Sequence, residues 1–149
     1  MKSCITLFIC LCLSACGFQK EYPEAMRQAI RCLETDPDSA LFYLSSVDSI
    51  LSEEPEETRM YHALLTLRAE DKLRIQQNSD SAIKSIVAYY DKQGDPVKQL
   101  EAYYMLGRVY RTLGDSPRSL QAFQQAAEIS HECDRPELSG RIYEQMSYL

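Results

Sequence analysis

The feature that most constrains the fold of this chain is a short motif that returns after a fixed number of residues. Residues 38–41 read Asp-Ser-Ala-Leu, and residues 80–83, which lie 42 positions later, read Asp-Ser-Ala-Ile. The same step carries Tyr61 onto Tyr103. In a helical chain, self-similarity at a period of roughly 20–50 residues indicates stacked units that bury one another's apolar faces. We therefore expect a repeat array rather than a single closed core.

Composition and punctuation both indicate that the repeating units are helical. Leu, Ala, Glu, Gln and Arg are frequent, whereas the 149 residues include only five glycines. Asp-Pro or Ser-Pro pairs at 36–37, 95–96 and 116–117 place a capping side chain before a proline that suits a first helical turn. Gly94 and Gly114 provide stops. We predict an all-α fold of antiparallel helix pairs, with helices at about 23–34, 37–51, 55–74, 80–93, 96–113, 117–132 and 135–149.

One unit matches a known pattern closely. Its first helix offers an aromatic residue, Leu-Gly and a tyrosine, and its second helix offers two small residues around an aromatic one: Tyr103, Leu106, Gly107, Tyr110, Ser119, Phe123 and Ala126. With this spacing, the segment 100–133 resembles a tetratricopeptide repeat, a helix–turn–helix unit that is typically about 34 residues long. The flanking copies are divergent, and Ile142-Tyr143 stands 40 positions after Ala102-Tyr103. The resemblance implies an α-solenoid whose concave side is lined by the first helix of each pair.

The first sixteen residues predict export from the cytoplasm. Lys2 precedes an apolar stretch over 5–13, which is far shorter than the roughly 20 residues that cross a bilayer. The stretch ends in Leu-Ser-Ala followed by Cys16, which resembles the lipobox of bacterial lipoproteins. That resemblance implies a signal peptide over 1–15, lipidation of Cys16, a tether over 16–22 and a helical-repeat domain over 23–149. The alternative is an ordinary cleaved signal that a cysteine happens to follow.

A lipobox followed by divergent helix pairs resembles the tetratricopeptide lipoproteins of Bacteroidota. This resemblance implies a protein of the cell envelope that is held to a membrane by its N-terminal lipid. Gly17 follows the cysteine, where some bacteria place an aspartate that retains lipoproteins in the inner membrane. The outer membrane is therefore the favoured location.

The charge of the chain excludes some classes of partner. The 16 basic and 22 acidic residues give a formal charge of −6, and removal of Lys2 with the signal makes the mature chain more acidic still. An acidic surface repels phosphate backbones, so we predict that nucleic acid is not a partner. The same negative charge gives no electrostatic attraction to anionic lipids, so the acyl chains alone would hold the protein to the membrane.

The cysteines do not form a disulfide framework. Three of the six lie in the predicted signal and a fourth is the lipidation site, which leaves Cys32 and Cys133 about 100 residues apart. We interpret both as buried or half-buried thiols, with a single disulfide as the alternative.

Catalytic motifs are missing from the sequence. It contains no glycine-rich phosphate loop, nucleophile elbow or zinc-binding histidine pair, and only two histidines in all. The contiguous residues 131–134, His-Glu-Cys-Asp, cannot all face one ion. We predict no enzymatic activity, no cofactor and no metal site.

The candidate binding residues lie on the first helix of the best repeat. Positions expected to be exposed on its concave side are Glu101, Tyr104, Arg108, Arg111 and Thr112, and the step of 42 positions carries this face back onto Arg59 and His62. Two arginines one turn apart beside a tyrosine suit a carboxylate ligand. The alternative is a solvated helix face whose arginines pair with local acids.

Together these observations predict a non-catalytic, lipid-anchored scaffold that binds a protein or peptide through its concave face. One alternative is an envelope lipoprotein that binds a glycan or nutrient, and another is the truncated sensing part of a longer signalling protein. The helix at 135–149 would begin a new repeat with nothing to cover it. We therefore expect it to act as a cap or as a dimer contact if the chain is not a truncated product.

Overall fold

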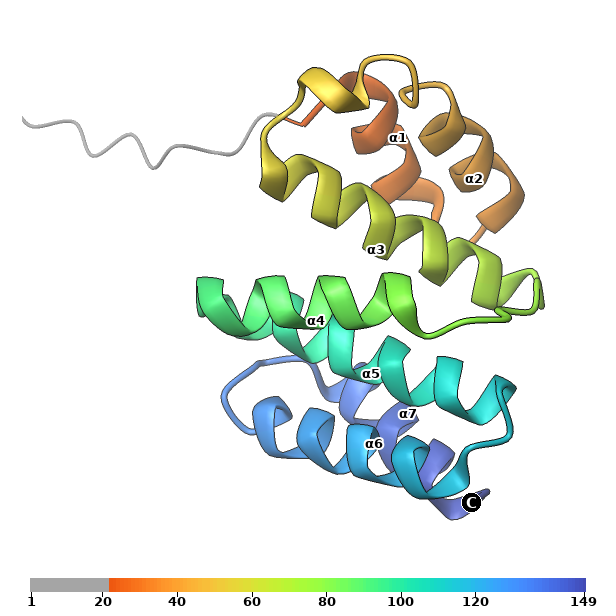
Figure 1. Ribbon diagram of the computed structural model, residues 1–149, viewed down its shortest axis with the longest axis vertical. Helices are drawn as coiled ribbons and strands as arrows, with labels where there is room; N and C mark the ends of the chain where they lie inside the picture. Colours follow the sequence, from red (N-terminus) through yellow and green to blue (C-terminus); the bar gives the residue numbers. More distant parts are fainter. Residues whose placement is uncertain (1–21) are drawn as a thin grey trace, which may run out of the picture.

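The computed structural model describes residues 22–149, so the predicted signal peptide and Cys16 lie outside the described residues. The described part is all-helical, with α1 and α2 at one end of the long axis, α3 and α4 in the middle, and α5, α6 and α7 at the other end (Figure 1). Consecutive helices pack on each other as the pairs α1/α2, α3/α4 and α5/α6, and α7 packs on α6. The elements are α1 (Glu24–Cys32), α2 (Pro37–Ser45), the 3-10 turn η1 (Leu51–Glu53), α3 (Glu56–Lys72), α4 (Ser81–Gln93), α5 (Pro96–Thr112), α6 (Ser116–Ser130) and α7 (Pro136–Ser147). The predicted helical repeat array is confirmed.

The predicted boundaries hold within about three residues for every helix except the second. The prediction of a helix over 37–51 is wrong at its end, because α2 stops at Ser45 and the chain continues through turns into η1. Ser45 Oγ donates to the Phe42 carbonyl at 2.9 Å and Ser46 Oγ to the Tyr43 carbonyl at 2.6 Å. Such local side-chain bonds compete with helix propagation. The chain then continues through turns that bury Val47, which is 4% exposed, against the core.

The helix ends follow the predicted cap chemistry. Asp36 accepts a hydrogen bond from the Ser39 amide at 3.1 Å, and Asp95 accepts from the amides of two residues of the first turn of α5. At the start of α6 the cap is Asp115 rather than the predicted Ser116. Gly94 and Gly114 adopt φ of 71° and 76°, the left-handed conformation that glycine allows at a helix stop.

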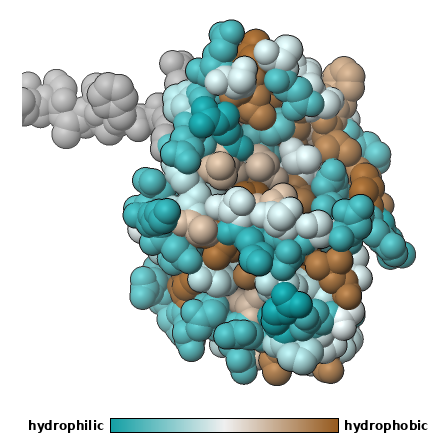
Figure 2. All heavy atoms as spheres, viewed as in Figure 1, coloured by the Kyte–Doolittle hydropathy of each residue, from teal (hydrophilic) through white to brown (hydrophobic). Residues whose placement is uncertain are grey.

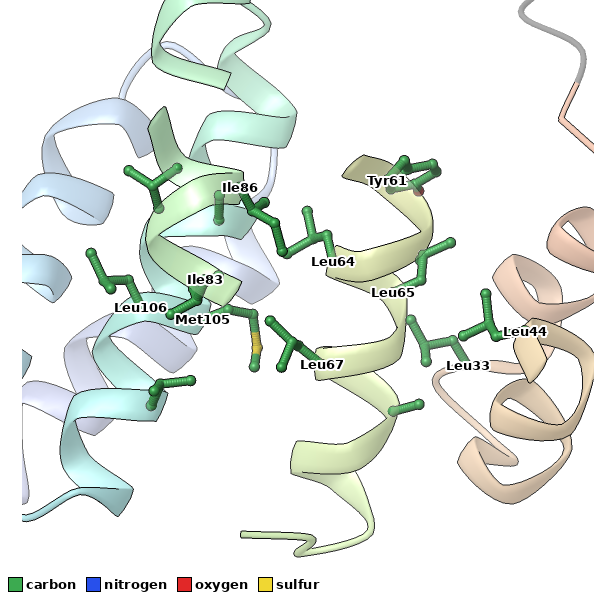
Figure 3. Packing of buried hydrophobic residues seen from close by; sticks show 14 of the residues in the cluster. Leu33, Leu44, Tyr61, Leu64, Leu65, Leu67, Ile83, Ile86, Met105 and Leu106 are labelled. Carbon is green, nitrogen blue, oxygen red and sulfur yellow. The ribbon is translucent and has the colours of Figure 1, made fainter. Parts of the chain in front are cut away.

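The centre of the molecule is α3, which is covered on two opposite sides. Figure 3 shows Leu65 directed toward the α1/α2 pair, whereas Leu64 and Leu67 are directed toward α4 and α5. Leu64 is fully buried and Leu65 is 1% exposed. A helix that buries two faces joins the first pair to the second in one core, as nearest-neighbour stacking requires.

The second core lies where α5, α6 and α7 meet. Phe123 of α6 is fully buried, and it packs with Leu100 of α5 and Ile142 of α7. Gly107 allows the close approach of α5 and α6, because a β-carbon at this position would lie 2.5 Å from Phe123 Cε1. Ser119 Oγ, also fully buried, donates to the Gly107 carbonyl at 2.8 Å. This is the tight helix contact that the tetratricopeptide resemblance implies.

The last helix covers the end of this core. Ile142 is fully buried and Met146 is partly buried, whereas Gly140, Arg141 and Glu144 are exposed. The inner face of α7 is apolar and its outer face is largely polar, although Tyr143 is 52% exposed. Whether this helix acts as a cap or as a dimer contact stays a prediction. On the face seen in Figure 2, hydrophilic side chains alternate with small apolar patches.

Two further observations concern the described residues as a whole. Cys32 and Cys133 are both free and half-buried, which confirms the interpretation of separate thiols.

Among helices α1 to α7, none has both the length and the apolar character needed to cross a membrane.

Candidate partner-binding groove

The first helices of the successive pairs enclose a cavity of about 600 Å³, which we call the main chamber. A cavity of this size lies in the usual range for ligand sites. Its walls come from α1, α3, α5 and α7 and from the segments that adjoin them. The lining residues are Ile30, Leu33, Glu34, Tyr61, Leu65, Arg68, Asp71, Lys72, Arg74, Glu101, Tyr104, Met105, Arg108, Arg135, Glu137, Leu138, Arg141, Glu144 and Gln145.

The main chamber differs in charge from the rest of the protein. Six of its lining side chains are basic and five are acidic, a net charge of +1 in a chain whose formal charge is −6. Apolar side chains such as Leu65, Met105 and Leu138 lie between the charged ones. The chamber therefore offers apolar contact and paired charges to an occupant of mixed character.

A buried carboxylate organises one wall of the main chamber. Glu101 is 5% exposed, and its two oxygens face arginines from different helices. Arg68 Nη1 lies 3.1 Å from Glu101 Oε2, and Arg135 Nη2 lies 3.3 Å from Glu101 Oε1. Arg135 donates a hydrogen bond to Oε1, whereas Oε2 accepts none and is stabilised only by the charge of Arg68. The two ion pairs offset part of the cost of burying the carboxylate and join α3, α5 and the start of α7.

Glu34, in the turn after α1, forms a second ionic cluster. Its carboxylate lies 2.9 Å from Arg68 Nη2, 2.9 Å from Lys72 Nζ and 3.3 Å from Arg141 Nη2. Burial alone would raise the pKa of Glu34, but the three cations outweigh it and lower the pKa to about 2. Arg141 belongs to α7, so this cluster links the first helix pair to the last helix.

A lysine is covered at the edge of this region. Lys98 Nζ lies 3.1 Å from the centroid of the Tyr61 ring, a cation–π contact. Burial disfavours the charged amine and lowers the pKa of Lys98 to about 8, although nearby Glu101 and Asp95 oppose the shift. Burial likewise raises the pKa of Tyr61 above its usual value.

A second cavity of about 540 Å³, which we call the arginine chamber, adjoins the main chamber. The two chambers share Asp71, Arg74, Arg108 and Gln145. The arginine chamber is lined by the C-terminal ends of α3, α5 and α7: Asp71, Arg74, Ile75, Gln76, Arg108, Arg111, Thr112, Gln145 and Tyr148. We call the two adjoining cavities together the groove.

The predicted residues of α5 do line this groove. Glu101, Tyr104 and Arg108 lie in the main chamber, and Arg111 and Thr112 lie in the arginine chamber. The expectation that all five are exposed is wrong for Glu101, because its ion pairs hold it in the wall. Tyr104 and Arg108 are half-buried, and only Arg111 and Thr112 are exposed. Whether these residues bind a partner stays a prediction.

The residues carried back onto α3 do not line the groove. His62 is 7% exposed and its Nε2 lies 2.9 Å from the Leu44 carbonyl oxygen of α2, so the prediction of an exposed His62 is wrong. Arg59 Nη1 donates to the Glu54 carbonyl at 2.7 Å, in the irregular segment before α3. Both side chains therefore face the connection between α2 and α3.

The cause is the length of the step between repeats. A step two positions shorter than the one from Tyr61 to Tyr103 superposes the groove positions of the two helices: Tyr61 on Glu101, Leu65 on Met105, Arg68 on Arg108, Asp71 on Arg111 and Lys72 on Thr112. Two residues rotate a helix by about 200°, almost to its opposite face. The same shorter step, visible from Tyr103 to Tyr143, was the signal for Arg68 and Lys72. The same step carries Met105 onto Gln145, whereas Glu34 has no comparable signal.

The groove contains charged residues but no cluster with the chemistry of a metal centre. Among residues 22–149, no group of His, Cys, Asp and Glu side chains is arranged to hold a metal ion. Several of the charged side chains of the groove are instead joined in pairs of opposite sign, such as Arg68 with Glu101 and Arg108 with Asp71.

A stack of helix pairs with a polar groove along its concave side defines a class of protein, the helical-repeat scaffold. Residues 100–133 match the family model of the tetratricopeptide repeat, and this range is the one predicted from the sequence. Tetratricopeptide repeats are typical of scaffolds for protein–protein interaction. No curated protein and no solved structure matches the chain.

Proposed function

We propose that this protein is a non-catalytic scaffold, anchored by lipid in the cell envelope, that binds a segment of a partner protein in the main chamber. The observation that carries the proposal is the cavity itself, because all four groove-forming helices contribute to it. The first helix of each pair faces inward, so the array presents one continuous binding surface rather than separate sites.

The lining of the main chamber favours a protein segment as its occupant. Tyr104 is half-buried and stands on one wall, and Leu138 stands on another. Apolar anchors surrounded by charged groups are the usual composition of a peptide-binding surface. A volume of about 600 Å³ admits the side chains of a short segment but not a folded domain.

The anchor is proposed from the sequence that precedes the described residues. The lipobox ending at Cys16 supports lipidation, and Gly17 supports the outer membrane over the inner. Cys16 stands only eight positions before the start of α1 at Glu24, so a lipid on it would keep the groove close to the membrane surface.

The anchor is tested by metabolic labelling with a fatty acid in a bacterial host. We expect the label on the wild-type protein and on Cys32→Ser, and we expect none on Cys16→Ser. Membrane fractionation should follow the same pattern. Label that persists on Cys16→Ser would contradict the anchor without affecting the proposed groove.

The groove is tested by a photo-crosslinking amino acid placed at Tyr104 or Leu138, which lie on two walls of the main chamber. The control position is Gln124, an exposed residue of α6 outside the groove. We expect both groove positions to capture the same protein and Gln124 not to capture it. Different products at the two groove positions, or the same product at Gln124, would contradict binding in the main chamber.

A further inference from the structure

Two arginines in the arginine chamber converge on an uncharged acceptor. Arg108 Nη1 donates to Gln145 Oε1 at 3.0 Å, and Arg111 Nη1 donates to the same oxygen. Gln145 is 7% exposed, so this oxygen lies inside the groove wall rather than in solvent. A single neutral oxygen therefore occupies the point at which two guanidinium groups meet.

The charges around this oxygen are not balanced. Asp71 Oδ1 accepts from Arg108 Nε at 3.1 Å and from Arg108 Nη2 at 2.8 Å, so the one carboxylate of the chamber is already engaged. Within residues 22–149, neither Arg74 nor Arg111 forms an ion pair. Three arginines against one aspartate leave a net charge of +2 in a chain whose formal charge is −6.

The geometry holds the arginines ready for a ligand. The Arg111 guanidinium carbon lies 5.4 Å from the centroid of the Tyr148 ring, and Asp71 fixes Arg108 through two hydrogen bonds. Ordered guanidinium groups lose little side-chain entropy when they bind a second acceptor. Hydrogen bonds between a guanidinium and an ionised oxygen are also roughly twice as strong as those between neutral groups.

We propose that the arginine chamber binds a side-chain carboxylate of an acidic protein segment and that Gln145 Oε1 is the internal acceptor which this carboxylate displaces. The inference rests on the proposed function, since the segment would be the one that enters the main chamber. It adds the chemical class of the partner: a segment with Asp or Glu beside the apolar residues that fill the main chamber.

Displacement of Gln145 does not require α7 to move. Ile142, one turn earlier on the same helix, is fully buried and anchors α7 against the second core. A rotation about the side-chain bonds of Gln145 is sufficient to clear the oxygen from Arg108 and Arg111. The neutral amide thus accepts hydrogen bonds from donors of the two arginines that would otherwise be unpaired, and it yields to an acceptor that carries charge.

The test uses the full chain purified in detergent and a hexaglutamate peptide that is acetylated and amidated, so that only side-chain carboxylates are offered. Affinity is measured by calorimetry at low ionic strength. We expect the double variant Arg74→Ala with Arg111→Ala to weaken peptide binding about tenfold or more. We expect an effect of the same size for Gln145→Glu, because this substitution places a tethered carboxylate on the arginines.

Matched controls separate the site from the overall charge of the chain. Gln124→Glu makes the same chemical change on the exposed face of α6, and Lys92→Ala removes one positive charge at the end of α4. Both are expected to keep the wild-type affinity within about twofold. A hexaglutamine peptide of the same blocked form should bind neither the wild-type protein nor the variants.

Several outcomes would overturn the inference. One is that hexaglutamate does not bind the wild-type protein, and another is that it binds Gln145→Glu as tightly as the wild type. A third is that inorganic phosphate binds with the same affinity as hexaglutamate and with the same dependence on Arg111, which would indicate a site for free anions. Thermal unfolding shows whether each variant is folded. If the crosslinked partner of the Tyr104 variant is captured equally well with the arginines replaced, the proposed function stands and the arginine site is wrong.

Discussion

Replacing Gly107 by alanine tests the packing between α5 and α6 most directly. The added β-carbon would lie 2.5, 2.6 and 2.8 Å from three carbons of the Phe123 ring, well inside normal contact distance. Phe123 is fully buried, so the ring cannot rotate into solvent to relieve the overlap. Overpacking of a core typically costs about 1–3 kcal/mol.

An opposing effect must be included before the sign is decided. Alanine is a better helix former than glycine by about 0.5–1 kcal/mol, and Gly107 lies within α5. The overlap with three ring atoms outweighs this gain, so we expect Gly107→Ala to lower the free energy of unfolding by about 1–2 kcal/mol. In a domain of this length that corresponds to a fall in Tm of a few degrees, about 3–8 °C.

The assay is urea unfolding followed by helical circular dichroism, with Gly140→Ala as the control. Gly140 is a helical glycine of α7 with no atom within 4 Å of the added β-carbon, so there only the gain in helix propensity remains. We expect Gly140→Ala to be neutral or stabilising. If Gly107→Ala is as stable as Gly140→Ala, the close contact with Phe123 does not exist and the assigned register of the repeat fails.

Three further predictions concern single groups. Glu34→Gln should lower the free energy of unfolding at pH 7 by on the order of 1 kcal/mol, a figure that is already reduced because the side chain is partly exposed. The folded-state pKa of Glu34 is about 2, so the difference between the variant and the wild type should disappear as the pH falls from 4.5 to about 2. Urea unfolding at a series of pH values measures this difference. Lys98 has a folded-state pKa of about 8, below its ordinary 10.5, so between these pH values the unfolded chain binds a proton that the folded protein does not. The stability of the wild type relative to Lys98→Met should therefore rise as the pH increases from 8 to 10.5 in the same assay. Asp95→Ala removes the acceptor for two amides at the start of α5 and should cost about 1 kcal/mol in thermal unfolding, whereas a loss below a few tenths would contradict the cap.

Much of the fold follows from local signals in the sequence. Proline after an aspartate marks the starts of α2 and α5, and Gly94 and Gly114 mark stops, because each requires a backbone conformation that few residues share. The early end of α2 was not predictable in this way. Ser45 and Ser46 can support a helix or terminate it, and only the packing of the chain that follows decides between the two.

The groove was predicted on one helix and missed on its neighbour for a geometric reason. The spacing of Arg108 and Arg111 by one helical turn indicates a candidate site on α5. Which residues of a neighbouring helix face the same groove depends on the repeat register to within one residue. The step from Tyr61 to Tyr103 was two positions too long for the inward-facing side chains. The shorter step would also have placed Gln145 in the groove, at the position of Met105. Its role as an acceptor had no sequence signal, because it depends on the two arginines that donate to it.

The ionic cluster at Glu34 has a consequence for how this molecule comes apart. In a linear stack each unit touches only its neighbours, so the terminal units fray independently. Here Arg141 reaches the carboxylate of a residue 107 positions earlier in the chain. Loss of either end removes a contact of the other, and amide hydrogen exchange in α1 and α7 should therefore accelerate together when salt weakens the cluster. The ion pair between Arg141 and Glu34 thus connects helices at opposite ends of the described stack, so the local stability of α1 and that of α7 are linked.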